Sequence, residues 1–221
     1  MNFETWVHRS SHLIFISILC LYILLAILAP IFMKIGLDYP AKFIYWIYSN
    51  FCHQFAHRSW FLFGDQPFYP LYPSANSNLT TFQEAFGYQE NDTEFSRSII
   101  GNDLFGYKMA FCQRDLAIYG SLLIFGLIYL LTGKKLKRIP LLFWILLGVI
   151  PLGIDGVFQL FGSNQVGIPL IGIWESTPFI RSITGGLFGL FTGWFIYPSI
   201  DLIKERQNKR DYPTNTETEL L

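Results

Sequence analysis

The sequence predicts an all-α integral membrane protein, with four transmembrane helices and a further helix that lies at the outer interface or is partly inserted. Composition is the first reason: 52% of the residues are hydrophobic and only 14% are charged, whereas soluble domains carry about 25% charged residues. The second reason is four apolar runs about as long as a bilayer requires. These runs indicate the lipid bilayer as a partner. The formal net charge is zero, so we expect no nucleic acid as a partner.

The four predicted spans are residues 12–33, 116–132, 139–161 and 179–200. The first is longer than the roughly 7–15-residue core of a signal peptide, so we expect an uncleaved anchor. The fourth carries Gly185, Gly189 and Gly193 on one face, and glycines also recur in the third around Pro151. We therefore expect a tight contact between the third and fourth spans, with a bend at the proline.

Basic residues predict the orientation. The segments "GKKLKR" (133–138) and "KERQNKR" (204–210) each carry four positive charges, and such segments stay on the cytoplasmic side. Both termini should then be cytoplasmic, and residues 34–115 and 162–178 should lie outside. Residues 1–200 form a single membrane domain, and residues 201–221 form a basic, disordered tail. The expected location is the plasma membrane of a bacterium.

The outer segment between the first two predicted spans is expected to have two parts. Residues 41–63 are predicted to form the interfacial helix, because Trp46 and Trp60 suit a membrane surface whereas His53, His57 and Arg58 are costly against lipid. Residues 64–106 are rich in Pro, Asn, Ser and Gly, which predicts an extracytoplasmic loop.

Costly polar residues converge on the outer leaflet in this topology. Ionisable groups in a membrane are candidates for function by default. The set comprises Cys52, His53, Arg58, Cys112, Arg114, Asp115, Asp155, Gln159, Glu175, Ser176 and Arg181. The three arginines and three acids could also form a structural ion-pair network, but such a network leaves the cysteines and histidines unexplained.

Cys52 and Cys112 allow two interpretations. On an oxidising side of the membrane they would form a disulfide. Alternatively they bind a metal ion with His53, because mixed sulfur, nitrogen and oxygen ligand sets suit zinc. His53 and His57 have the spacing of a zinc-protease motif, but Gln54 stands where the catalytic glutamate would be. Both interpretations remain open, and Cys20, in the middle of the first span, is expected to be a buried apolar residue.

An ordered series of motifs carries a resemblance to a known family. The motifs are "CHQ" with "RS" four residues on, "CQRDLAIYGS", "DGVFQ", "ES" and "RSITGG". Over residues 43–198 the chain resembles the uncharacterised polytopic membrane proteins named domain of unknown function 2085. The resemblance implies membrane class and a set of residues, but no activity. The residues that match its pattern are Cys52, His53, Gln54, Arg58, Ser59, Cys112, Arg114, Asp115, Tyr119, Asp155, Gln159, Glu175, Ser176, Arg181 and Thr184. His57 falls at a variable position, which weakens a two-histidine ligand set.

Two functions compete. The first is a metal-dependent enzyme acting on a lipid or lipid-linked substrate. Its zinc ligands would be Cys52, His53 and Cys112, and its catalytic carboxylates would come from Asp115, Asp155 and Glu175. Arg58, Arg114 and Arg181, with Gln159 and Ser176, would bind the anionic part of the substrate. The second is a non-enzymatic carrier or accessory protein that binds an ion or an anionic small molecule and contains a Cys52–Cys112 disulfide.

Overall fold

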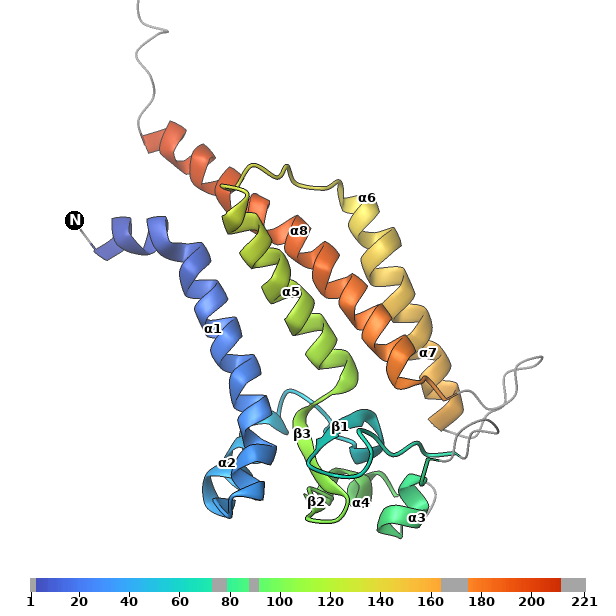
Figure 1. Ribbon diagram of the computed structural model, residues 1–221. Helices are drawn as coiled ribbons and strands as arrows, with labels where there is room; N and C mark the ends of the chain where they lie inside the picture. Colours follow the sequence, from blue (N-terminus) through green and yellow to red (C-terminus); the bar gives the residue numbers. More distant parts are fainter. Residues whose placement is uncertain (1–2, 73–78, 88–91, 164–174, 212–221) are drawn as a thin grey trace, which may run out of the picture.

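Four long helices run beside one another, and a small folded unit closes one end of them (Figure 1). The structure is a computed structural model that describes residues 3–72, 79–87, 92–163 and 175–211. Within these residues, four helical segments are long and apolar enough to cross a membrane: Ser10–Lys34, Gln113–Leu131, Leu141–Leu160 and Pro178–Gln207. The four predicted spans are therefore confirmed, and the small unit, the described part of residues 49–112, is called the cap below.

The spans belong to helices α1 (Phe3–Lys34), α5 (Gln113–Leu131) and α8 (Pro178–Asp211), and to a third span in three parts. Those parts are α6 (Leu141–Trp144), the π-helix η2 (Ile145–Val149) and α7 (Ile150–Ser163). Helix α8 continues through the basic segment as far as Asp211, so the first half of the predicted disordered tail is helical. The other half lies outside the described residues.

Close packing by glycine joins α5 to α8. A Cβ added at Gly189 would overlap the carbonyl oxygen of Ile118, and one at Gly185 would lie 2.6 Å from the carbonyl oxygen of Arg114. The prediction that these glycines share one close-packed face was right. The predicted partner was wrong, because the face meets the second span and not the third.

The third span contacts α8 chiefly near its middle. An added Cβ at Gly148 would lie 3.4 Å from Cβ of Phe191, and Trp144 Nε1 donates a hydrogen bond of 3.0 Å to Thr192 Oγ1. Gly153 has nothing within 4 Å of such a Cβ. The irregularity predicted at Pro151 takes the form of the π-helical turn directly before it, a feature that often marks a functional position.

Helix α2 (Asp38–Tyr48) is shorter than the predicted helix over residues 41–63. The helix ends because Asn50 Nδ2 donates hydrogen bonds to the carbonyl oxygens of Trp46 and Ile47, at 3.2 and 3.1 Å. This polar side chain thereby occupies the backbone acceptors of the last turn. Tyr39 and Phe43 also point outward, as does Trp46. This aromatic outer face is what an interfacial helix requires, and it agrees with the expected position of this helix.

The predicted loop over residues 64–106 is largely folded into the cap. Strands β1 (Ser59–Leu62), β3 (Gly106–Cys112) and β2 (Gly101–Asn102) form an antiparallel sheet in that order. The short helices are η1 (Ala56–Arg58), α3 (Phe82–Phe86) and α4 (Thr93–Ser98). The cap has its own apolar cluster of Ala56, Phe61, Tyr69 and Phe82. The sheet adds to the predicted helical fold without changing its class.

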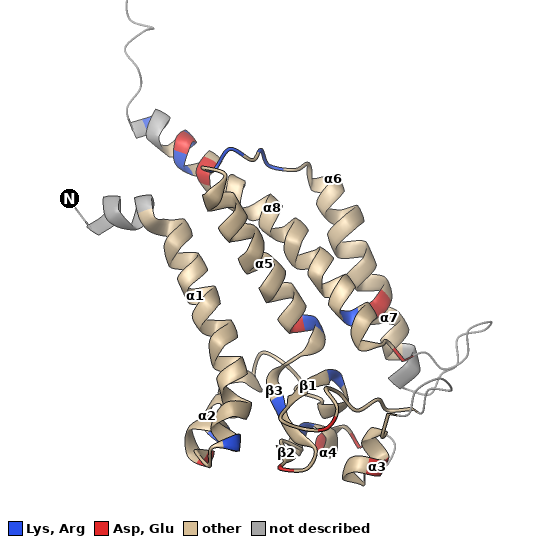
Figure 2. Cartoon of the chain, viewed as in Figure 1, with Lys and Arg blue, Asp and Glu red and all other residues tan. Residues whose placement is uncertain are grey.

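Charged residues gather at the two ends of the bundle, and the middle has few (Figure 2). The start of α1, the basic loop between α5 and α6, and the end of α8 lie at the end opposite the cap (Figure 1). There, His12 Nε2 and Tyr129 Oη contact the two carboxylate oxygens of Asp201, at 2.7 and 2.8 Å. Buried polar contacts therefore occur at this end of the bundle as well as at the end where the costly residues were predicted to converge.

Candidate functional site

A cavity of about 180 Å³ lies where the cap meets α5, α7 and α8. It gathers all the predicted site residues except Asp155, Glu175 and Ser176. The lining residues are Phe51, Cys52, His53, Gln54, Phe55, Arg58, Cys112, Arg114, Asp115, Gln159 and Arg181. Segments that are distant in the sequence thus meet at one cavity.

Cys52, Cys112 and Asp115 form a compact group at this cavity. Their two sulfur atoms and one carboxylate oxygen all lie within 4.8 Å of one another. Cys112 ends β3 and caps α5, because its Sγ accepts a hydrogen bond of 3.4 Å from the backbone N–H of Asp115. Both cysteines are free in the structure. A hydrogen bond with Cys52, together with burial, raises the pKa of the Cys112 thiol.

The two histidines of the "CHQFAH" segment do not converge. The predicted helix ends before them, so their four-residue spacing does not place them on one helical face. His53 is exposed and lines the cavity, but it lies outside the compact group, where Asp115 takes its predicted place. His57 is buried and bonds Ser96 Oγ at 2.8 Å, and burial holds its pKa well below the usual value.

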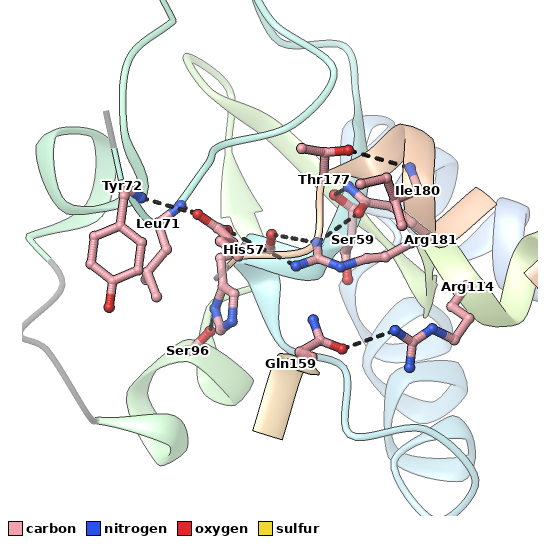
Figure 3. Close-up of polar contacts among 12 residues, drawn as sticks. His57, Ser59, Leu71, Tyr72, Ser96, Arg114, Gln159, Thr177, Ile180 and Arg181 are labelled. Carbon is pink, nitrogen blue, oxygen red and sulfur yellow. Dashed lines mark hydrogen bonds and ion pairs between the residues drawn. The ribbon is translucent and has the colours of Figure 1, made fainter. Parts of the chain in front are cut away.

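Arg181 reaches from the first turn of α8 into the base of the cap, and its side chain is almost fully buried. Its Nη1 donates to Gln113 Oε1 at 3.0 Å (Figure 3). Gln113 Nε2 in turn donates to the backbone carbonyl of Ser59 at 3.2 Å. Sequence reasoning did not single out Gln113. The signal that could have identified Gln113 was its position: it lies between Cys112 and Arg114, in a group of polar residues at the start of a membrane helix.

Arg114 is held by α7. Its Nη2 contacts Asp155 Oδ2 and donates to Gln159 Oε1 at 3.0 Å, and Figure 3 shows the amide and guanidinium groups facing one another. Thr184 Oγ1 donates to the same Asp155 oxygen at 3.3 Å. Asp155 therefore lies behind Arg114, where it orients a cavity residue and is not itself part of the lining.

Glu175 fastens the cap to the start of α8. Its two oxygens accept the backbone N–H groups of Leu71 and Tyr72, at 3.2 and 3.3 Å (Figure 3). Arg181 Nη2 lies 3.9 Å from Oε1. Burial raises the pKa of Glu175. Two of the ion pairs expected from a structural network are thus present, and these contacts place Glu175 in a structural position.

Several donors at the cavity are unused. Among the described residues, Nε of Arg114, Nε and Nη2 of Arg181, and Nε2 of Gln159 are buried without a hydrogen-bond partner. Ser176 Oγ nearby is also buried and unpaired. Unpaired buried polar atoms are unfavourable and rare in native proteins. Most of these atoms are donors, and Oδ1 of Asp155 is an unpaired acceptor among them.

The four-span fold defines an integral membrane protein, and comparison with known proteins agrees. A family described as "Predicted membrane protein (DUF2085)" matches residues 94–195. The chain is also 27% identical, over 193 residues, to Uncharacterized protein MJ1492 of Methanocaldococcus jannaschii, covering 84% of this chain and 89% of that protein. No solved structure matches the chain. The family match confirms, over residues 94–195, the resemblance to the domain of unknown function 2085 that the motifs indicated.

Proposed function

We propose that the protein is a metal-dependent membrane enzyme that acts on the anionic headgroup of a lipid or lipid-linked molecule. The observation that supports this function best is that one cavity joins the Cys52–Cys112–Asp115 group to Arg58, Arg114 and Arg181. A metal ion and an anionic substrate would then lie side by side.

Zinc suits the compact group. Two thiolates and a carboxylate are ligands that zinc accepts, and three protein ligands leave the fourth position open for water or substrate, as in catalytic sites. Backbone N–H groups of Gln54 and Asp115 donate to the sulfur atoms of Cys52 and Cys112, at 3.5 and 3.4 Å, and these bonds help to fix the positions of the two sulfur atoms. When bound, zinc would supply a water with a pKa of about 7.

The guanidinium groups suit an anionic headgroup. Arg114 and Arg181 retain donors that the protein does not use, and arginine binds phosphate and carboxylate groups through pairs of hydrogen bonds. A cavity of about 180 Å³ is smaller than the roughly 300–1,000 Å³ of sites for drug-sized ligands. A headgroup fits this size if the rest of the substrate stays in the bilayer.

Catalytic roles follow the positions of the side chains. Asp155 and Glu175 are engaged behind the lining, where they orient Arg114 and fasten the cap. We assign Asp115 to the metal. His53 lines the cavity and is exposed, and histidine is the side chain that most often transfers protons in catalysis. His53 is therefore the proposed proton acceptor.

The proposed site faces the outside of the cell. The basic loop between α5 and α6 lies at the end opposite the cap, together with the end of α8 (Figure 2). Positively charged segments remain cytoplasmic. Both termini are then cytoplasmic, and the cavity opens near the outer leaflet, where a lipid headgroup is available.

Metal analysis of the purified protein tests the function. We expect about one zinc ion per chain in detergent solution under reducing, chelator-free conditions, and loss of that zinc in Cys52→Ser and in Cys112→Ser. Cys20→Ser is the matched control, because Cys20 lies in α1 away from the cavity, on the exposed face of the helix and not buried as predicted. A wild-type protein without stoichiometric metal would overturn the proposal.

A non-enzymatic function is the second candidate, and the closeness of the two sulfur atoms favours it. In that case Cys52 and Cys112 form a disulfide in the cell, and the arginines bind an anion without chemistry. Mass spectrometry after thiol labelling of non-reduced protein separates the candidates. Two unreactive cysteines joined by a bond would support the second function, and two labelled cysteines would support the first.

A further inference from the structure

We infer that Lys108 and Gln54 are positioning residues for Cys52, and that the buried amine of Lys108 fixes the backbone turn that aims this cysteine at Cys112. The inference deepens the proposed metal site and rests on it. Neither residue was among the candidate ligands, catalytic groups or substrate-binding groups.

Lys108 is an unusual residue in the middle of the cap sheet. It belongs to β3 and is only 1% exposed. Its Nζ donates to the backbone carbonyl oxygens of Gln54 and Arg97, at 2.8 and 2.7 Å. Among the described residues it has no ion-pair partner within 4.0 Å. Burial of an unpaired amine is costly, and this burial lowers its pKa to about 7. A lysine that served only to fill space would be replaceable by an apolar side chain.

The turn that Lys108 holds has an unfavourable backbone. Gln54 has a φ of 54°, a left-handed conformation that is uncommon and strained for a residue other than glycine. Hydrogen bonds of both its side chain and its backbone carbonyl hold Gln54 in this conformation. Its Nε2 donates to the carbonyl oxygens of Tyr45 and Ala110, at 3.0 and 3.2 Å, and its own carbonyl accepts from Lys108. One of the two anchors of this side chain lies on α2, outside the cap, and the other lies on β3, inside it.

The consequence of this conformation appears at Cys52. The backbone N–H of Gln54 points at Cys52 Sγ, at 3.5 Å. If the carbonyl of Gln54 lost its partner, the backbone would relax toward negative φ and turn this N–H away. Cys52 would then lose both its hydrogen bond and its fixed distance from Cys112. Lys108 therefore acts on the thiol through the backbone of Gln54.

Lys108→Met is the decisive variant, because methionine keeps the length of the side chain and removes the amine. Two readouts apply. Cobalt(II) affinity, followed by the thiolate charge-transfer band, should fall about ten- to a hundredfold, as for other residues that orient metal ligands. The rate at which diamide converts the two thiols to a Cys52–Cys112 disulfide, while diamide is reduced to a hydrazine, should fall severalfold. The second readout requires no metal.

Tyr45→Phe is the matched control. It removes the hydrogen bond from Tyr45 Oη to the backbone carbonyl of Lys108, so it weakens the same strand without touching the carbonyl of Gln54. We expect it to lower thermal stability while leaving cobalt affinity and diamide rate within about twofold of wild type. A control that slows the diamide reaction as much as Lys108→Met would reduce the role of Lys108 to general stability and overturn the inference.

The double variant Lys108→Met with Gln54→Gly tests the route. Glycine adopts positive φ without steric cost, but Gln54→Gly also removes the two Nε2 hydrogen bonds, so the single variant Gln54→Gly is the reference. If Lys108 acts by holding the strained backbone of Gln54, Lys108→Met should slow the diamide reaction less in the Gln54→Gly background than in the wild type. An equally large effect in both backgrounds would overturn the assignment to the Gln54 backbone, and a wild-type rate in Lys108→Met would overturn the whole inference. Failure of the wild-type protein to bind cobalt would instead contradict the proposed metal function, while the diamide rates still decide the role of Lys108.

Discussion

Arg114 on α5 contacts Asp155 on α7, and Thr184 on α8 donates to the same carboxylate oxygen at 3.3 Å. Three membrane spans thus meet at one acid directly behind the cavity. Because apolar surfaces have no preference for one another over lipid, such polar contacts help to hold spans together. The same contact therefore stabilises the bundle and orients Arg114 at the cavity.

Removal of Asp155 should destabilise the bundle strongly. Asp155→Ala leaves the Arg114 guanidinium without its partner, which typically costs about 3–5 kcal/mol for a buried pair. The double variant Arg114→Met with Asp155→Leu should lose much less, because no unpaired charge remains. Thermal unfolding in detergent measures both. Lys42→Met, at an exposed ion pair with Asp38, is the control, and an equal loss in it and in Asp155→Ala would contradict the prediction.

The glycine contact between α5 and α8 gives a second prediction. Gly189→Ala places a methyl group on the carbonyl oxygen of Ile118, so the helices must separate at a cost of about 1–3 kcal/mol. Gly186→Ala, on the same helix, has nothing within 4 Å of its new Cβ and should be tolerated. The thermal unfolding midpoints of the two variants test this prediction. Similar midpoints would show that the close approach of α5 and α8 at Gly189 does not contribute to stability.

Acid should weaken the cap through His57. Burial lowers the pKa of His57 well below 6.5 in the folded protein. At pH values between this lowered pKa and 6.5, only the unfolded chain binds the proton. Stability then falls as pH drops through 6.5, by up to about 1.4 kcal/mol per pH unit. Unfolding midpoints at several pH values should show a smaller acid loss in His57→Gln than in wild type. His53→Gln, at the exposed histidine, should behave as wild type; if His57→Gln did too, the acid sensitivity would lie elsewhere.

The orientation can be tested by labelling in intact cells. In a background without the native cysteines, Tyr39→Cys on the exposed face of α2 should react with a membrane-impermeant maleimide. Lys135→Cys, in the basic loop after α5, should react only after the cells are opened. The reverse pattern would place the cavity in the cytoplasm.

Much of the bundle was predictable because the solvent sets its pattern. A span must be apolar over about 20 residues, so Leu116 or Phe179 can be assigned from composition alone. The convergence of Cys52, Cys112 and Asp115 was predictable in part, because the motifs occur at the same ends of the spans. The same argument predicted that Arg114 and Gln159 lie at this end of the bundle.

The remaining features depend on contacts that a linear pattern does not show. The aromatic run 41–63 looks like one helix, but Asn50 ends it and the following residues pair with β3. Gly189 marks a close approach without naming its partner. Lys108 stands in an apolar strand where charge alone would have placed it at the surface, and only the two carbonyl oxygens at its amine account for its position.

The π-helical turn Ile145–Val149 has a consequence for the length of the third span. Each residue of an α-helix turns the chain by about 100°, so a turn with one extra residue offsets everything after it by about that angle. Trp144, before the turn, meets Thr192, and Asp155, after it, reaches Arg114. Deletion of one residue from this turn would leave the span apolar and long enough for the bilayer, yet rotate Asp155 and Gln159 away from the cavity. The number of residues in this span is therefore constrained by the cavity as well as by the thickness of the membrane.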